Sequence, residues 1–125
     1  MSWNVKYNSA NKIMVLTLEG HLNFKEIIEA SYTNIEEAKS RNITNLLVDC
    51  SLLLVDADRT ELFQLPSRFY TKWGMDPSTR IALIEPFETD AKAKVDFYVF
   101  ATQNLGWSAD KFTNRKKALK WLAEE

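Results

Sequence analysis

The sequence contains few of the residues that usually build reactive or metal-binding sites. It has one cysteine, Cys50, and one histidine, His21, among 125 residues. A single cysteine cannot form an internal disulfide, and neither Cys-x-x-Cys nor His-x-x-His occurs. We therefore expect no disulfide, no metal site and no cofactor.

Glycine is also scarce, with three residues in the whole chain. Each of the three falls at the end of a predicted strand or helix. No glycine-rich phosphate-binding loop and no Gly-x-Ser-x-Gly turn can be built from them. These absences argue against nucleotide chemistry and against a serine hydrolase.

An excess of charge of one sign is missing as well. Sixteen basic residues face seventeen acidic ones, and the isoelectric point is near 5.9, so we expect no nucleic-acid partner. The one basic cluster is interpreted as the solvated face of a C-terminal helix, and it comprises Arg115, Lys116, Lys117 and Lys120.

Long apolar runs are absent too. No stretch approaches the roughly 18 apolar residues that cross a bilayer, so we expect no membrane span. The first residues do not resemble a secretory signal, which favours the cytoplasm.

The hydrophobic pattern that is present predicts an α/β protein. It favours an N-terminal hairpin and then strands that alternate with helices. Alternation of this kind implies right-handed crossovers and a mainly parallel sheet with flanking helices. We expect one domain over residues 1–125, with strands near 3–7, 13–18, 45–55, 80–84 and 107–113, and helices near 23–41, 58–73, 89–105 and 114–122.

The segment 45–59 is the most informative part of the pattern. An apolar run typical of a strand covered on both faces leads directly to Asp58 and Glu61, which form a helix-start signal. Pro66 lies inside the helix that follows, so we expect a kink or a break there.

The order of elements, together with several short motifs, resembles the STAS domain family. Within it, the chain is similar to the SpoIIAA-like branch of small bacterial proteins. The matching segments are Leu18-Glu19-Gly20-His21-Leu22, Leu47-Val48-Asp49, Val55-Asp56 and Ala118-Leu119-Lys120-Trp121-Leu122.

This resemblance implies a regulatory role without catalysis. In the anti-sigma factor antagonists of the family, the helix after the central strand opens with Asp-Ser-Ser-Gly, and a partner kinase phosphorylates the serine. The corresponding residues here are Asp56, Ala57, Asp58 and Arg59, so the phosphorylatable serine is missing. The resemblance implies a protein-interaction module with binding residues Asp56, Ala57 and Asp58. Asp58 is interpreted as a helix cap, and a permanent negative charge is the alternative.

Polar residues collect where the predicted parallel strands end. Ligands bind at this edge of an open sheet, and these residue types could in principle form a hydrolase site or a metal site. No spacing assembles them into a known catalytic set, and we predict a protein that is not an enzyme. The residues are His21, Asp49, Cys50, Ser51, Asp56, Asp58, Glu85 and Asn114.

Aromatic residues give the second set of candidates. Phe97 and Phe100 project opposite the apolar stripe of the helix over 89–105. They can pack against a neighbouring helix, or they can form a partner surface, a dimer face or one wall of an apolar pocket. With Phe63, Phe69, Tyr70 and Trp73 they could enclose a ligand, so the alternative function is a small carrier of a lipid or another apolar molecule.

Overall fold

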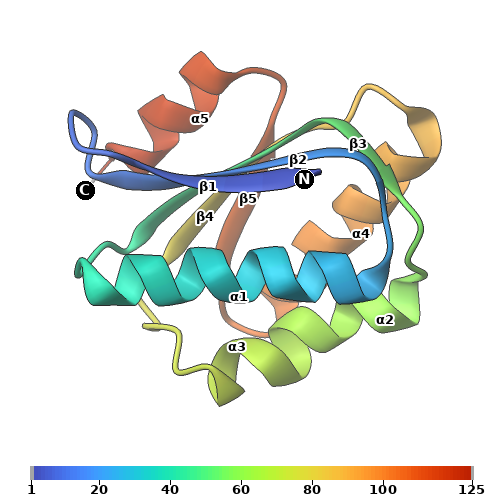
Figure 1. Ribbon diagram of the computed structural model, residues 1–125, viewed down its shortest axis with the longest axis horizontal. Coiled ribbons are helices and arrows are strands. Elements are labelled where there is room, and N and C mark those ends of the chain that lie inside the picture. The colour runs from blue at the N-terminus through green and yellow to red at the C-terminus, as the bar shows by residue number, and fades with distance from the viewer. Residues whose placement is uncertain (1, 125) are drawn as a thin grey trace.

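A five-stranded sheet with the order β1-β2-β3-β4-β5 forms the middle layer of the protein (Figure 1). The structure is a computed structural model that describes residues 2–124. β1 (Trp3–Asn8) and β2 (Ile13–Leu22) form an antiparallel hairpin. β3 (Asn45–Val55), β4 (Arg80–Ile84) and β5 (Ser108–Phe112) then add in parallel. The predicted mixed sheet with an N-terminal hairpin is confirmed, and β3 is its central strand.

Helices cover the two faces of the sheet unequally (Figure 1). The face that we call the broad face carries α1 (Phe24–Ser40), α2 (Arg59–Gln64), α3 (Tyr70–Lys72) and α4 (Thr89–Asn104). The opposite face, called the α5 face, carries α5 (Arg115–Leu122). The α/β order predicted from the hydrophobic pattern is confirmed.

The core divides in the same way because side chains alternate along each strand. Leu46, Val48 and Cys50 of β3 join the large cluster under α1, α2 and α4. Leu47, between them in sequence, points to the α5 face and packs with Ala118 of α5. Cys50 is 1% exposed, so the expected buried thiol is confirmed.

β2 and β3 extend well beyond their shorter neighbours. β4 pairs with β3 only from Asn45 to Asp49. Past that point β3 carries an extra residue, because Thr17 pairs with Asp49 whereas Glu19 pairs with Leu52. The sheet edge where parallel strands end is therefore stepped.

Pro66 does not break its helix. Residues Leu65–Phe69 form a π-helical turn that joins α2 to α3. Proline has no N–H to donate to the preceding turn, and a wider turn accommodates this loss. The hydroxyl of Ser67 donates to the Phe63 carbonyl at 2.7 Å, and Gly74, with φ of +70°, ends the segment. The predicted kink is thus a local widening of a continuous helical segment.

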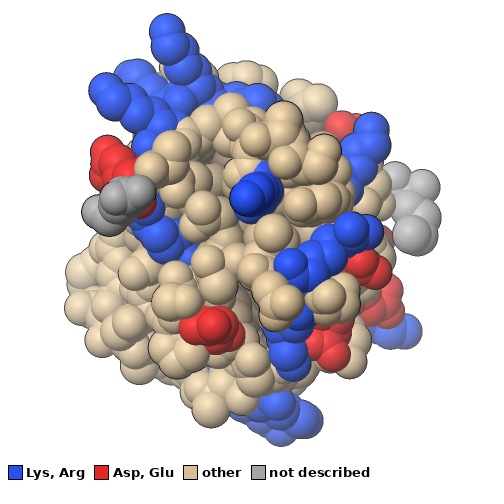
Figure 2. All heavy atoms as spheres, turned by 90° about the vertical axis from the view of Figure 1, so that its left-hand side faces the viewer, with Lys and Arg blue, Asp and Glu red and all other residues tan. Residues whose placement is uncertain are grey.

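The basic residues of α5 are all exposed, and basic side chains gather over this end of the molecule (Figure 2). The solvated helix face predicted from the sequence is confirmed. Within residues 2–124, no helix is long and apolar enough to cross a membrane.

Candidate functional site

The turn after β3 contains the three candidate binding residues that surround the start of α2. Asp58 caps the helix: its Oδ1 accepts from the Glu61 amide at 2.7 Å, and Glu61 Oε1 accepts from the Asp58 amide at 3.0 Å. This reciprocal pair is the predicted capping box. Ala57 is 1% exposed, so the accessible side chains of the turn are those of Asp56 and Asp58.

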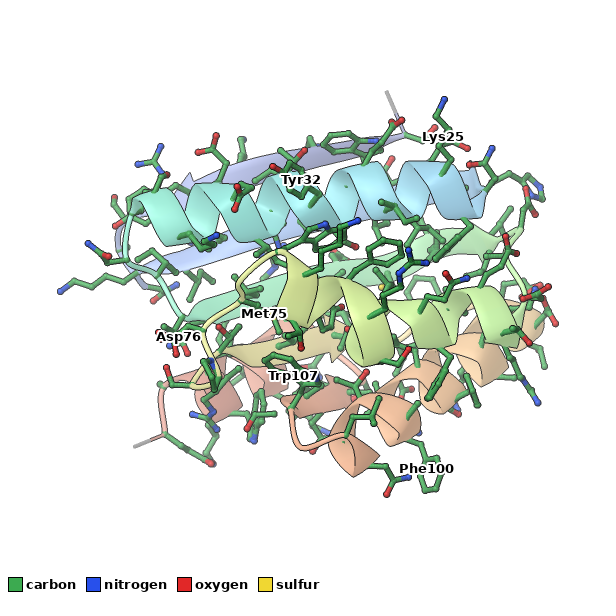
Figure 3. The ribbon with its side chains drawn as sticks, turned by 90° about the horizontal axis from the view of Figure 1, so that it is seen from below. Lys25, Tyr32, Met75, Asp76, Phe100 and Trp107 are labelled. Carbon is green, nitrogen blue, oxygen red and sulfur yellow. The ribbon has the colours of Figure 1, made fainter. Side chains whose placement is uncertain are left out.

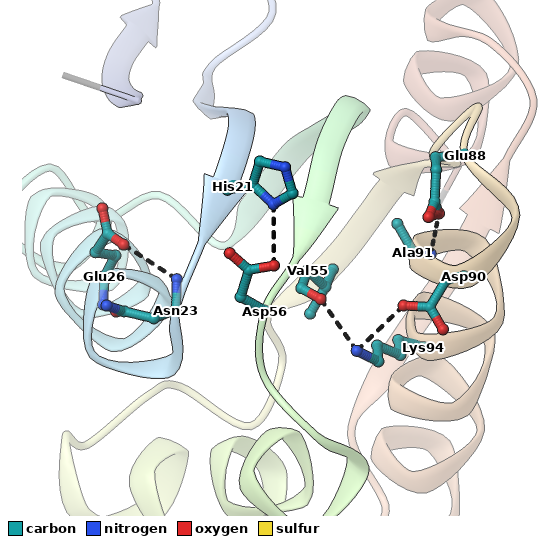
Figure 4. Close-up of polar contacts among 9 residues, drawn as sticks. All are labelled: His21, Asn23, Glu26, Val55, Asp56, Glu88, Asp90, Ala91 and Lys94. Carbon is teal, nitrogen blue, oxygen red and sulfur yellow. Dashed lines mark hydrogen bonds and ion pairs between the residues drawn. The ribbon is translucent and has the colours of Figure 1, made fainter.

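Asp56 reaches back to the end of β2 (Figure 4). His21 Nδ1 donates to Asp56 Oδ1 at 3.0 Å, and the Asp56 amide donates to the Leu22 carbonyl at 2.9 Å. The His21 and Asp56 side chains are 71% and 48% exposed, so water screens the pair and its contribution to stability is small. The pair orients a carboxylate at the surface of the turn.

Lys94 of α4 anchors the same turn from the other side (Figure 4). Its ammonium donates to the Val55 carbonyl at 3.0 Å and pairs with Asp90 Oδ2 at 3.2 Å. The Lys94 side chain is 20% exposed. The last residue of β3 is therefore tied both to β2 and to α4.

The other predicted edge residues do not join this turn. Asp49 bonds Ser51 and lies 3.9 Å from Arg115, while Glu85 lies 4.0 Å from Lys92. Asp49 and Asp56 are separated by about 23 Å of extended chain, at ~3.3 Å for each of seven residues. The sequence analysis predicted that these residues lie together at one edge of the sheet. This prediction is wrong because β2 and β3 extend beyond the ends of β4 and β5.

Asn114, another residue predicted to lie at this edge, stabilises a helix end. Its side chain accepts from the Lys117 amide at 2.9 Å and caps α5. Over residues 2–124, no group of three His, Cys, Asp or Glu side chains is arranged to hold a metal ion.

Exposed aromatic side chains lie on the outer side of α2 and α4, next to the turn. Phe100 is 64% exposed and projects away from the protein (Figure 3), and Phe63 is 40% exposed. Phe97 is half-buried, with the guanidinium of Arg59 5.8 Å from its ring centroid. We call Phe63, Phe97 and Phe100 the aromatic surface. Because Arg59 follows the cap Asp58 directly, the turn and the aromatic surface adjoin.

The other aromatic residues of the α2–α3 segment pack inward. Phe69 and Trp73 stack at 5.2 Å, and Trp73 meets the edge of Tyr32 on α1 at 5.3 Å. Tyr70 is 4% exposed. Core packing accounts for these three side chains of the segment, and Phe63 alone among its aromatics belongs to the exposed set.

A cavity of about 70 Å³ lies between the broad face and helices α1, α2 and α4. Its wall is almost entirely aliphatic, formed by side chains such as Leu53, Val55 and Leu62. Its polar lining residues are Ser31, Asn34, Cys50, Tyr70, Lys94 and Tyr98.

Asn34 is the residue that sequence reasoning missed. It is 2% exposed, and its Oδ1 has no hydrogen-bond partner among residues 2–124. A buried polar group left unpaired costs about 1–3 kcal/mol. The sequence does contain a sign that Asn34 is buried. It lies three residues after Ser31 and seven after Ile27, so its amide is on the apolar stripe of α1.

Two tyrosines and the cysteine complete the polar part of the wall. The hydroxyls of Tyr70 and Tyr98 hydrogen bond to each other. Burial raises the pKa of Tyr98 to about 12 and the pKa of Tyr70 well above its usual value. Burial, aided by the charge of Asp49, also raises the pKa of Cys50, so its sulfur stays a protonated thiol with little reactivity.

Known structures resemble this architecture over nearly the whole chain. An uncharacterised protein of the DUF3478 family from Shewanella loihica PV-4, with a SpoIIAA-like fold, aligns with a TM-score of 0.61 at 15% identity. The alignment covers 97% of this chain and 92% of that one. The chain has the SpoIIAA-like fold.

The anti-sigma factor antagonist SpoIIAA itself is similar in two states. Its unphosphorylated form aligns with a TM-score of 0.57 at 15% identity, covering 96% of each chain. The phosphorylated form of SpoIIAA, a Bacillus cell fate determinant, aligns with a TM-score of 0.57 at 15% identity, over 96% of this chain and 98% of that one.

The similarity lies in the backbone and not in the sequence. No protein-family model matches the chain, and no curated protein matches it significantly. At 15% identity the SpoIIAA-like fold is shared, and the roles of individual side chains must be argued from this chain alone.

Proposed function

We propose that the protein is a non-catalytic binding module that recognises a protein partner, or a second copy of itself, through the turn after β3 and the aromatic surface. The observation that best supports this proposal is the position of Arg59. It follows the cap Asp58 and lies over Phe97, so charged and aromatic groups form one continuous surface.

The composition of this surface supports protein recognition. Aromatic side chains and arginine are enriched at the centres of interfaces, and charged groups are typical of their rims. Here Phe100 and Phe63 are exposed, with Arg59 beside Phe97 and the carboxylates of Asp56 and Asp58 at the border.

We further propose that this module is not switched by phosphorylation of the turn. In the STAS family that the sequence resembles, the modified serine stands at the start of the helix after the central strand, and we propose that Ala57 and Asp58 occupy the corresponding positions here. Alanine offers no hydroxyl, and the Asp58 carboxylate is engaged in capping. Asp56 and Asp58 therefore give the turn a constant negative charge.

A binding role also fits the separation of the acid and base candidates. His21 and Asp56 form one exposed pair, while Asp49 and Glu85 have basic partners of their own. The Cys50 thiol lies in the interior.

The double variant Phe97→Ser/Phe100→Ser tests the proposal. We expect it to abolish concentration-dependent self-association in sedimentation velocity, or to lose the partner that wild-type protein retains in pull-downs. Circular dichroism should be unchanged, because Phe100 is exposed and Phe97 is half-buried.

Phe87→Ser is the matched control. Phe87 is 78% exposed and precedes α4, and its amide donates to the Ser51 carbonyl. It should sediment and capture partners like wild type. Identical behaviour of the double variant and Phe87→Ser would contradict the proposal.

The cavity favours a second function, a small carrier of an apolar molecule. Its aliphatic wall suits such a ligand, but about 70 Å³ is far too small for a lipid acyl chain. Native mass spectrometry of the purified protein separates the two functions, since it reports subunit number and retained ligand together. A bare monomer at all concentrations would count against self-association and against the carrier function.

A further inference from the structure

The cavity beneath the broad face contains a hydrogen-bond acceptor for which the described chain supplies no donor. Asn34 lines the cavity at 2% exposure, and its Oδ1 is unpaired within residues 2–124. Buried polar side chains in folded proteins almost always have partners. The exception points to a donor that comes from outside the chain.

Apart from the Ser31 hydroxyl, the other strong polar groups on the wall already have partners. The hydroxyls of Tyr70 and Tyr98 bond each other, and the Lys94 ammonium is held by the Val55 carbonyl and Asp90. Burial keeps the Cys50 thiol protonated, and a thiol is a weak donor. Asn34 is thus the buried acceptor with unused capacity for a strong hydrogen bond, and the hydroxyl of Ser31, one turn earlier on α1, lies on the same wall.

The size of the cavity limits what can bind. A cavity of about 150 Å³ lined by aliphatic side chains holds benzene, and this one measures about 70 Å³. By that comparison the occupant has roughly three non-hydrogen atoms, and a molecule with about four tests the upper limit of size. A short unbranched chain meets this limit, whereas a ring does not.

We propose that the cavity binds a short aliphatic molecule that carries one hydroxyl or amide donor, with the donor hydrogen on Asn34 Oδ1 and the chain against Leu53 and Val55. This inference rests on the second proposed function, the carrier of an apolar molecule. It adds the ligand class and the residue that selects it.

Water and charged molecules suit the cavity less well. An ordered buried water needs two to four polar partners, and Asn34 with Ser31 supplies the lower number on a wall that is otherwise almost entirely aliphatic. A charged ligand would need an opposite charge inside the protein, and the nearest cation, Lys94, is paired with Asp90.

Methyl NMR titrations of the intact chain with three probes test the inference. 1-Propanol carries the donor, 1-chloropropane has similar size without a donor, and dissolved xenon reports access to an apolar cavity. We expect all three to shift the methyl signals of Leu53 and Val55. 1-Propanol should bind about tenfold more tightly than 1-chloropropane.

The variant Asn34→Leu keeps the side-chain size and removes the acceptor. It should lower 1-propanol affinity about tenfold and leave xenon shifts in place. Asn45→Leu is the control, because Asn45 already donates to the Leu122 carbonyl at 3.1 Å on the α5 face. It should bind all three probes like wild type.

The outcomes separate this inference from the function it rests on. Xenon shifts without any preference for 1-propanol, or without an effect of Asn34→Leu, would overturn the role of Asn34 and leave an apolar cavity. A tightly held water that none of the probes displaces would overturn the ligand class. If neither xenon nor the propyl compounds shift any cavity methyl, the carrier function fails as well.

Discussion

The helices pack more closely against the α5 face of the sheet than against the broad face. On the α5 face, Leu47, Ala82 and Ala118 are all 0% exposed, and the small alanines let α5 approach the sheet closely. On the broad face, α1, α2 and α4 cover the sheet from different directions and leave a cavity of about 70 Å³ with an unpaired amide. The difference teaches that one face is closely packed, whereas the other tolerates an imperfection, the cavity in which we propose that a ligand binds.

Truncating one leucine on each face is the strongest way to test this comparison. Leu47→Ala should lower the free energy of unfolding by about 3–4 kcal/mol, because neighbours surround the whole side chain. Leu53→Ala should cost about 2–3 kcal/mol, since one side of Leu53 already borders the cavity. Urea unfolding of both variants measures the two values. Equal losses would mean that the two faces are packed alike.

Alkaline pH should weaken the broad face through its tyrosine pair. Burial raises the pKa of Tyr98 from 10.0 to about 12, so the unfolded state loses its proton first as the pH rises. Stability is fully present below pH 10 and falls by about 2 kcal/mol from this group by pH 12. Unfolding curves at a series of pH values measure the slope, and Tyr98→Phe should flatten it. The same slope in this variant would show that Tyr98 is not its source.

Exchanging two asparagines for leucine should change stability in opposite directions. Asn34→Leu removes a buried unpaired amide and should raise the free energy of unfolding by about 1–2 kcal/mol. Asn45→Leu removes a paired one and should lower it by about 1 kcal/mol. Thermal and urea unfolding both report the sign. A loss of stability in Asn34→Leu would indicate that the amide has a partner in solution.

The turn after β3 should show the smallest effects on folding. Asp58→Ala removes a helix cap and should cost about 1 kcal/mol. Asp56→Asn alters an exposed pair and should stay within about 0.5 kcal/mol of wild type. Titration calorimetry with the isolated partner measures the binding affinity of this variant. A changed affinity with unchanged stability would show that the role of Asp56 is recognition.

Much of the fold could be predicted because local signals and tertiary structure agree. The apolar run before Asp58, the capping pair Asp58 and Glu61, and the glycine after α3 each act within a few residues. Such short-range rules specify which elements form, and the alternation of strands and helices then specifies a parallel sheet.

The candidate site could be predicted only in part, because its geometry depends on strand lengths and helix positions. Asp49 and Asp56 are far apart because β3 stays extended from Asn45 to Val55, whereas β4, with five residues, ends opposite Asp49. The cavity at Asn34 depends on how three helices meet over the sheet, which no short stretch of sequence encodes. The exposure of Phe100 and the half-burial of Phe97 likewise depend on where α2 lies.

Lys94 connects the cavity with the turn after β3. Its side chain lines the cavity, and its ammonium holds the carbonyl of Val55, the last residue of β3. A molecule that displaces this side chain on its way inward also releases the strand end that carries Asp56. Under the two proposals above, occupancy of the cavity would then change the shape of the turn after β3, and a small ligand would alter a protein contact that it never touches.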